Sequence, residues 1–135
     1  MKPAVSEYGR FSVVGDMAMR YDVGKKRGRW RIVAERIRTA LIGYGLGGRV
    51  FHAPLLEAVE DIELAVIMTR NEADVKNRYP HVRVVDSAEA IWTDDSIALV
   101  VISTPNATHA GLVEQALAAG KHVVVDKPFT LHTAE

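Results

Sequence analysis

The chain has 135 residues and no cysteine, which excludes disulfides, thiolate chemistry and cysteine-ligated metals. Apolar residues make up 48% of it and charged residues 25%, as in an ordinary globular protein with room for one domain and its core. No stretch approaches the roughly 18 apolar residues of a membrane span, and the N-terminus lacks the apolar segment of a secretory signal. We therefore expect a cytoplasmic protein without membrane contact.

The net charge of zero hides an asymmetry along the chain. Residues 1–38 carry ten Lys and Arg against four Asp and Glu, whereas residues 39–135 carry seven against thirteen. The basic part includes "GKKRGRWR" at residues 24–31, a run that could in principle contact nucleic acid. No nucleic-acid-reading module accompanies this run. We interpret residues 1–36 as a flexible, solvated basic extension and expect no nucleic-acid partner.

A regular alternation of apolar runs and helical patterns begins at residue 39. Short runs rich in Val, Ile and Leu predict buried strands at residues 39–45, 62–68, 82–85, 97–103 and 121–126. The segments between them predict helices at residues 49–60, 71–79, 86–92 and 106–120. Pro54 cannot donate a backbone hydrogen bond, so we expect a kink or a restart of the first helix near His52. Asn71 and Asp86 are predicted to begin the second and third helices, and Gly120 to follow the last.

Buried strands that alternate with helices predict a parallel sheet that is covered on both faces. Right-handed crossovers then give an α/β fold with a doubly wound Rossmann sheet in the strand order 3-2-1-4-5. We assign this domain to residues 37–135. The sequence stops at "TLHTAE", where the helix leading to a sixth strand should begin, so we expect the sheet to lack that strand.

A glycine-rich turn joins the first strand to the first helix. Gly43, Gly45 and Gly48 match the pattern G-x-G-x-x-G there. The first glycine permits the tight turn, the second lets a pyrophosphate approach the backbone, and the third lets helix and strand pack closely. Backbone N–H groups at the helix start would face the anion, aided by the helix dipole. This setting favours a dinucleotide site over a purely structural turn or another nucleotide-like ligand.

The end of the second strand bears on the choice of dinucleotide. An NAD site usually has Asp or Glu there, whereas this chain has Thr69 and Arg70. A guanidinium can stack on the adenine and pair with a 2′-phosphate, and a threonine can donate its hydroxyl. Glu72 is a rival acid nearby, and Arg70 could also be a solvated loop residue. We predict NADP in preference to NAD.

Polar residues also follow the fourth and fifth strands, at the edge where such a sheet binds its ligand. The fourth strand runs into "STPNATH" at residues 103–109, and the fifth into "DKPF" at residues 126–129. Lys127 is a cation between a buried strand and a proline. It could bind a substrate hydroxyl or carbonyl, and burial could shift its pKa toward proton transfer. The alternative is a surface lysine at a strand end.

Four stretches together resemble the Gfo/Idh/MocA family of oxidoreductases: "GYGLGG", "FHAPLL", "STPNATH" and "AGKHVVVDKPF". The resemblance covers residues 37–135. It implies an N-terminal Rossmann domain that binds NAD or NADP, followed by a larger α/β domain. It also implies hydride transfer at the nicotinamide to or from sugars, inositols and related polyols.

The resemblance implies roles for single residues. Lys127 corresponds to the lysine of the family's Glu-Lys-Pro motif, which lies at the nicotinamide and helps to place the reacting hydroxyl. It is the one predicted catalytic residue. Thr69 and Arg70 would meet the adenosine ribose, and His109 would stand close to the cofactor. The predicted cofactor-binding residues are Gly43, Gly45, Leu46, Gly47, Gly48, Thr69, Arg70, Ser103, Thr104, Pro105, Asn106, His109 and Lys127.

The sequence departs from the family at several points. Asp126 stands where the family most often has Glu, and residues 1–36 match nothing in it. The acid and the histidine that the family carries in its second domain are absent from this sequence. No metal site is predicted, and the remaining histidines are interpreted as packing or surface residues: His52, His81, His122 and His132.

Two classes of function follow. The first is the NAD(P)-binding domain of an oxidoreductase that acts on a sugar or polyol, and we expect this chain alone to turn over no substrate. The second is a non-catalytic dinucleotide-binding module, working as a sensor, or a truncated remnant. In either case the open sheet edge favours self-association into a homo-oligomer. A methyltransferase that binds S-adenosylmethionine is disfavoured, because it would predict an acid closing the second strand and no Lys-Pro after the fifth.

Overall fold

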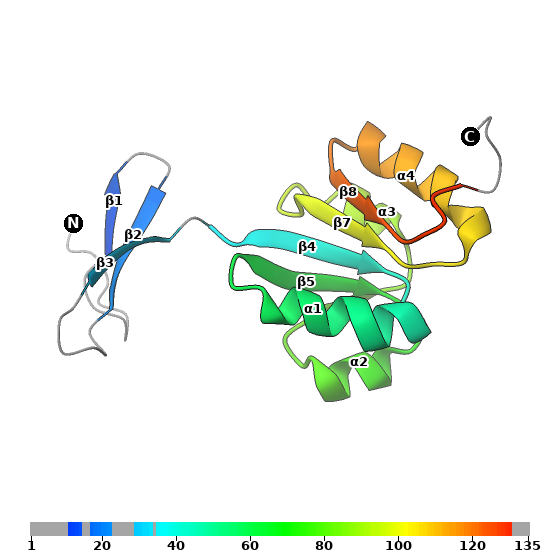
Figure 1. Ribbon diagram of the computed structural model, residues 1–135, viewed down its shortest axis with the longest axis horizontal. Helices are drawn as coiled ribbons and strands as arrows, with labels where there is room; N and C mark the ends of the chain where they lie inside the picture. The colour runs from blue at the N-terminus through cyan, green and yellow to red at the C-terminus, as the bar shows by residue number, and fades with distance from the viewer. Residues whose placement is uncertain (1–10, 15–16, 23–28, 34, 131–135) are drawn as a thin grey trace. The chain divides into compact units, whose positions relative to one another are not determined.

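A computed structural model describes residues 11–14, 17–22, 29–33 and 35–130 of the chain. It divides into two compact units, residues 1–36 and residues 37–135. The first unit holds an antiparallel three-stranded sheet in the order β1-β2-β3 (Figure 1). Its strands are β1 (Phe11–Val14), β2 (Met17–Asp22) and β3 (Arg29–Val33). The sequence analysis predicted no strand here, and its expectation of flexibility stays a prediction.

The second unit is built on a five-stranded sheet whose strands all run parallel. Its strands are β4 (Ile37–Ile42), β5 (Ile62–Met68), β6 (Arg83–Val85), β7 (Leu99–Ile102) and β8 (His122–Val125). The order across the sheet is β6-β5-β4-β7-β8, which is 3-2-1-4-5 within this unit. The predicted Rossmann topology is therefore confirmed for the described residues.

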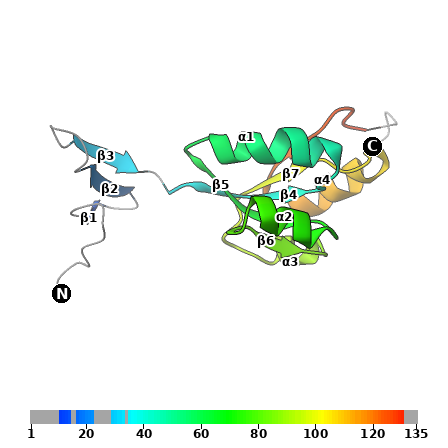
Figure 2. The same cartoon turned by 90° about the horizontal axis from the view of Figure 1, so that it is seen from below.

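Helices cover both faces of this sheet (Figure 1, Figure 2). They are the π-helical turn η1 (Gly48–His52), α1 (Ala53–Ala58), α2 (Glu72–Arg78), α3 (Glu89–Trp92), the short 3-10 turn η2 (Asn106–Thr108) and α4 (His109–Ala118). One buried cluster packs α1 and α2 against the sheet through Leu56 and Val75. The other packs α3 and α4 against the opposite face through Ile91 and Val113. The central strands β4, β5 and β7 bury residues on both faces, which explains why their sequences are mostly apolar.

Three of the predicted helix boundaries agree with the structure. The first helix changes from π-helical to α-helical between His52 and Ala53, which confirms the predicted restart next to Pro54. Asn71 caps α2 by accepting from the backbone N–H of Asp74 at 3.3 Å, as predicted. Gly120 follows the last helix with a φ of 72°, as predicted.

The expected cap of the third helix is wrong. Asp86 does not begin α3, which starts at Glu89 with Ala88 in the cap position and no side-chain cap bond. The hydroxyl of Ser87 instead accepts from the backbone N–H of Glu89 at 3.2 Å. A bend between β6 and α3 thus separates Asp86 from the helix start.

Candidate cofactor-binding site

The register of the parallel strands collects their carboxyl ends at one edge of the sheet. Ile42 is aligned with Ile102 and Met68, and through these with Val125 and Val85. The glycine-rich turn, the Thr69–Arg70 turn, residues 103–109 and residues 126–129 all follow these ends. The sequence analysis expected the polar segments to meet at this edge, and the alignment brings them there.

Gly43 begins the turn in a conformation that other residues rarely adopt. Its φ is 97°, and a Cβ built on it would lie 2.5 Å from the carbonyl oxygen of Ser103. The backbone N–H of Gly43 donates to the carbonyl of Met68 at 3.2 Å. On the other side, the N–H of Ser103 donates to the carbonyl of Ile42 at 2.8 Å. The turn is therefore fixed between the ends of the neighbouring strands β5 and β7.

The other glycines of the turn differ in their surroundings. A Cβ on Gly48 would overlap the carbonyl oxygen of Gly43, so the helix start and the strand end are in direct backbone contact. A Cβ on Gly47 would lie 2.8 Å from the hydroxyl of Ser103. Gly45 has no atom within 4 Å of such a Cβ, and Leu46 beside it is 72% exposed. The turn is thus packed at its two ends and open in its middle, which fits a pyrophosphate at Gly45.

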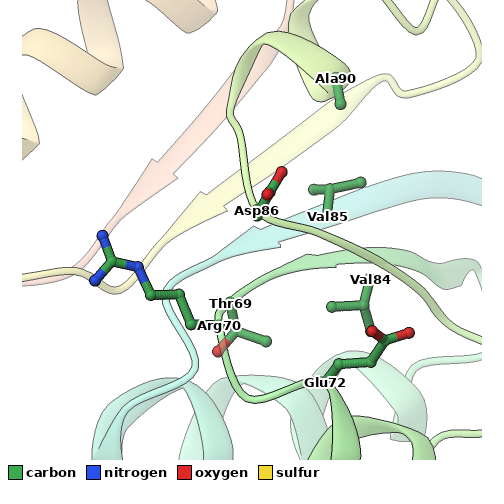
Figure 3. A pocket seen from close by; sticks show the side chains of 7 residues that line it. All are labelled: Thr69, Arg70, Glu72, Val84, Val85, Asp86 and Ala90. Atoms are coloured by element: carbon green, nitrogen blue, oxygen red, sulfur yellow. The ribbon is translucent and has the colours of Figure 1, made fainter.

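A cavity of about 530 Å³ lies at the carboxyl ends of β5 and β6. Its lining consists of Thr69, Arg70, Glu72, Val84, Val85, Asp86 and Ala90 (Figure 3). The cavity occupies the position that the sequence analysis assigned to the adenosine ribose. Asp86 is a lining residue that the analysis did not include, although its position directly after the third strand was a signal for it.

The cavity is lined by both positively and negatively charged side chains. In Figure 3 the guanidinium of Arg70 extends away from the carboxylate of Glu72. Among the described residues Arg70 takes part in no ion pair, so its charge is available to a ligand. The hydroxyl of Thr69 accepts from the backbone N–H of Asn71 at 3.1 Å and retains its own proton for donation.

His109 is fully buried and bridges two loops of the site. Its Nδ1 lies 2.9 Å from the carbonyl oxygen of Pro128, and its Nε2 lies 2.8 Å from that of Thr104. Both ring nitrogens are therefore directed at the protein backbone. The histidine joins the segment after β7 to the segment after β8.

Asp126 joins the same segment to the first helix. Its Oδ2 lies 3.3 Å from Nε2 of His52 and 3.5 Å from the hydroxyl of Ser103. Its Oδ1 accepts from the backbone N–H of Lys127 at 2.9 Å. The sequence analysis interpreted His52 as a packing or surface residue and missed this contact, which joins residues 74 positions apart.

The contacts of Asp126 predict a dependence of stability on pH. The N–H of Lys127 and then His52 hold the pKa of the Asp126 carboxyl below its usual value of 3.8. A lowered pKa in the folded state stabilises the protein at pH values above 3.8, and this stabilisation is lost as the pH falls through the folded-state pKa. Urea unfolding of wild type and Asp126→Asn should therefore differ most at neutral pH and converge as the pH falls below about 4. A difference that stays constant from pH 7 to pH 3 would contradict this assignment.

The remaining predicted site residues lie on the surface of the same edge. Lys127, Pro105 and Asn106 are exposed. None of the described side chains forms an ion pair with the ammonium of Lys127. The Thr104 hydroxyl lies 2.6 Å from that of Thr108. These positions agree with contact to a ligand, but the cofactor-binding role of each residue stays a prediction.

Other features of the described residues bear on the class of site. They contain no group of three or more His, Asp or Glu side chains that could hold a metal ion. His81 pairs with Glu57 at 3.2 Å, His122 is exposed, and His132 lies outside the described residues. No helix in the described part of the chain is long and apolar enough to span a bilayer.

Comparison with known protein families identifies the family of residues 37–135. Residues 37–135 match the model of an oxidoreductase family with an NAD-binding Rossmann fold. The chain belongs to this family, Gfo/Idh/MocA. Residues 37–135 thus form a Rossmann domain of this family, and the predicted resemblance is confirmed.

Two curated members of the Gfo/Idh/MocA family and one solved structure illustrate the relationship. The chain is 50% identical over 99 residues to the oxidoreductase YdgJ of Escherichia coli, covering 73% of the chain and 29% of YdgJ. It is 39% identical over 109 residues to the scyllo-inositol 2-dehydrogenase (NADP(+)) IolW of Bacillus subtilis, covering 81% and 30%. The structure of GenD2 from gentamicin A biosynthesis, in complex with NAD, matches with a TM-score of 0.69 and 34% identity, covering 77% and 30%. The chain therefore spans less than a third of the length of each.

Proposed function

We propose that residues 37–135 bind NADP, in preference to NAD, for an oxidoreductase that transfers hydride between the nicotinamide and a sugar, inositol or related polyol. One observation carries the proposal. Gly43 and Gly48 leave no room for a Cβ, whereas Gly45 between them faces open space at the carboxyl edge of the sheet. This combination favours a turn shaped for the backbone to meet a pyrophosphate.

The phosphates would be held by the backbone of the glycine-rich turn. Gly45, Leu46 and Gly47 lie at or just before the start of η1, where backbone N–H groups have no partner within the helix. These groups and the helix dipole attract an anion. Gly45 admits the phosphates because it has no side chain, and the exposed Leu46 beside it would cover them.

The adenosine ribose would occupy the cavity at Thr69 and Arg70. The guanidinium would pair with a 2′-phosphate, and the Thr69 hydroxyl would donate to it. Glu72 and Asp86 line the same cavity, and their carboxylates would instead favour the free hydroxyls of NAD. We favour NADP because Arg70 lies two residues after the end of β5 and makes no ion pair among the described residues. IolW, which is named as an NADP(+) enzyme, supports this preference.

Lys127 is the residue that we propose to act on the substrate. The bound nicotinamide would accept or donate the hydride. The exposed ammonium of Lys127 would donate a hydrogen bond to the oxygen of the reacting hydroxyl or carbonyl and so orient that carbon. Relatives named for inositol and UDP-N-acetylglucosamine dehydrogenation support a polyol or sugar as the substrate class.

The proposal includes a cytoplasmic location and a homo-oligomeric state. Support for self-association comes from β8, which forms one edge of the described sheet and leaves Val124 48% exposed. An uncovered strand edge of this kind favours association.

The test is calorimetric titration of the purified chain with NADPH and then with NADH. Arg70→Ala should weaken NADPH binding by about tenfold or more, because it removes a charge-assisted hydrogen bond, and should change NADH binding by less than about threefold. Arg78→Ala, which removes the same charge from the exposed last turn of α2, is the matched control and should leave both affinities unchanged. Equal losses for the two nucleotides, or NADH binding tighter than NADPH in the wild type, would reject the NADP preference. A folded chain that binds neither would reject the proposed function.

A further inference from the structure

The two residues that flank Lys127 are each held by another part of the domain. Asp126, which precedes it, contacts His52 and Ser103 through its carboxylate. Pro128, which follows it, has its carbonyl oxygen 2.9 Å from the buried ring of His109. An exposed loop is ordinarily among the more mobile parts of a protein. Contacts on both sides of Lys127 restrict this segment.

The contacts of Asp126 lead directly to the glycine-rich turn. Ser103 lies between Asp126 and this turn. Its hydroxyl is 3.5 Å from Oδ2 of Asp126, and it would lie 2.8 Å from a Cβ built on Gly47. His52 is the last residue of η1, the helical turn that begins at Gly48. The carboxylate of Asp126 therefore touches both the helix that leaves the turn and the residue that packs under it.

We propose that Asp126 is a positioning residue, which fixes Lys127 relative to the glycine-rich turn through its contacts with His52 and Ser103. The proposal rests on the proposed function for the role of Lys127 itself. A lysine fixed in this way is already oriented when the cofactor occupies the turn, so less ordering is required when the substrate binds.

The short side chain of Asp126 matters to this arrangement. Its Oδ1 accepts from the N–H of the next residue, Lys127, while its Oδ2 faces His52. A glutamate would carry its carboxylate one carbon farther from the backbone, so it could not keep both contacts without moving. These same contacts lower the pKa of Asp126, in agreement with a carboxylate that is ionised and held by donors.

The experiment measures backbone amide hydrogen exchange at Lys127 by NMR in the full 135-residue chain. In His52→Ala the carboxylate of Asp126 loses its partner on η1, and the Lys127 amide should exchange about three- to tenfold faster, as expected for one lost hydrogen bond. His52→Gln keeps an N–H donor and should restore most of the protection. The matched control is His81→Ala, which breaks a histidine–carboxylate pair of similar length at Glu57 and should leave the Lys127 amide unchanged.

The outcomes separate this proposal from the proposed function. Faster exchange at Lys127 in His52→Ala, with rescue by glutamine, supports the positioning role. Unchanged exchange in a folded His52→Ala variant overturns it, as does an equal acceleration in His81→Ala. If His52→Ala fails to fold, His52→Phe keeps the ring volume without the nitrogen and is judged by the same criterion. Failure of the wild type to bind NADPH or NADH would reject the proposed function and leave the exchange comparison intact.

Discussion

Gly48→Ala is expected to destabilise residues 37–135 by about 3 kcal/mol or more, because a Cβ there would overlap the carbonyl oxygen of Gly43. That oxygen belongs to the backbone of a turn tied to both neighbouring strands, so it cannot move aside cheaply. For a domain of this size the melting temperature should fall by about 10–20 °C. Gly43→Ala should act similarly, since its φ is 97° and its Cβ would press on Ser103.

Gly45→Ala should affect nucleotide binding and leave the stability almost unchanged. No atom lies within 4 Å of a Cβ at Gly45, so the free energy of unfolding should change by less than about 1 kcal/mol. The added methyl group would stand where the pyrophosphate approaches the backbone, and the affinity for NADPH should fall by about tenfold or more. Thermal unfolding and calorimetry on the same samples separate the two effects.

Gly111→Ala is the matched control for these glycine substitutions. Gly111 lies within α4, and a Cβ there also meets open space. Alanine should raise the stability by up to about 1 kcal/mol, because it lowers the conformational entropy that the helix loses on folding. NADPH binding should not change. If Gly45→Ala proved as destabilising as Gly48→Ala, the distinct roles assigned to these glycines would be wrong.

The second unit was predictable from the sequence because its signals are local and agree with one another. The central strands β4, β5 and β7 are buried on both faces, so their residues form mostly apolar runs, as in Ile62–Met68, whose bounds match the prediction. The glycine-rich turn follows from φ requirements and close backbone approach at fixed spacing. Because these constraints act between residues close in sequence, they can be recognised in a single sequence.

The strands of the first unit were missed because charge dominated the interpretation. Arg29–Val33 alternates arginine with apolar residues, which is a pattern of half-exposed strands as well as of a basic run. The sequence also has a Gly-Asp pair between the segments that form β1 and β2, a dipeptide typical of hairpin turns. This pair is therefore a local signal for the hairpin of β1 and β2.

The side-chain network around Lys127 was not predictable from spacing. His52 and Asp126 are 74 residues apart, and their contact depends on the π-helical turn that orients His52. His109 could be predicted to lie near the site, but not to direct both ring nitrogens at backbone carbonyls. Such contacts result from the tertiary arrangement of loops, and a single sequence contains no periodicity that reveals them.

His109→Leu is expected to lower the free energy of unfolding by about 1–3 kcal/mol. The leucine fills a similar volume but donates no hydrogen bond. The carbonyl oxygens of Thr104 and Pro128 then lose the ring that lies 2.8 and 2.9 Å from them. A neutral imidazole donates from one nitrogen only, and a buried polar group left unsatisfied costs about 1–3 kcal/mol.

His109→Leu should also loosen the two loops of the site, because the imidazole joins the segments that follow β7 and β8. Without it the two segments can separate, so the backbone amide of Lys127 should lose protection from exchange even at temperatures where the domain stays folded. Urea unfolding measures the first effect and amide exchange the second. His122→Leu is the control, since His122 is an exposed residue at the start of β8 and its replacement should change neither quantity appreciably. Wild-type stability in His109→Leu would mean that the histidine does not hold the two loops together.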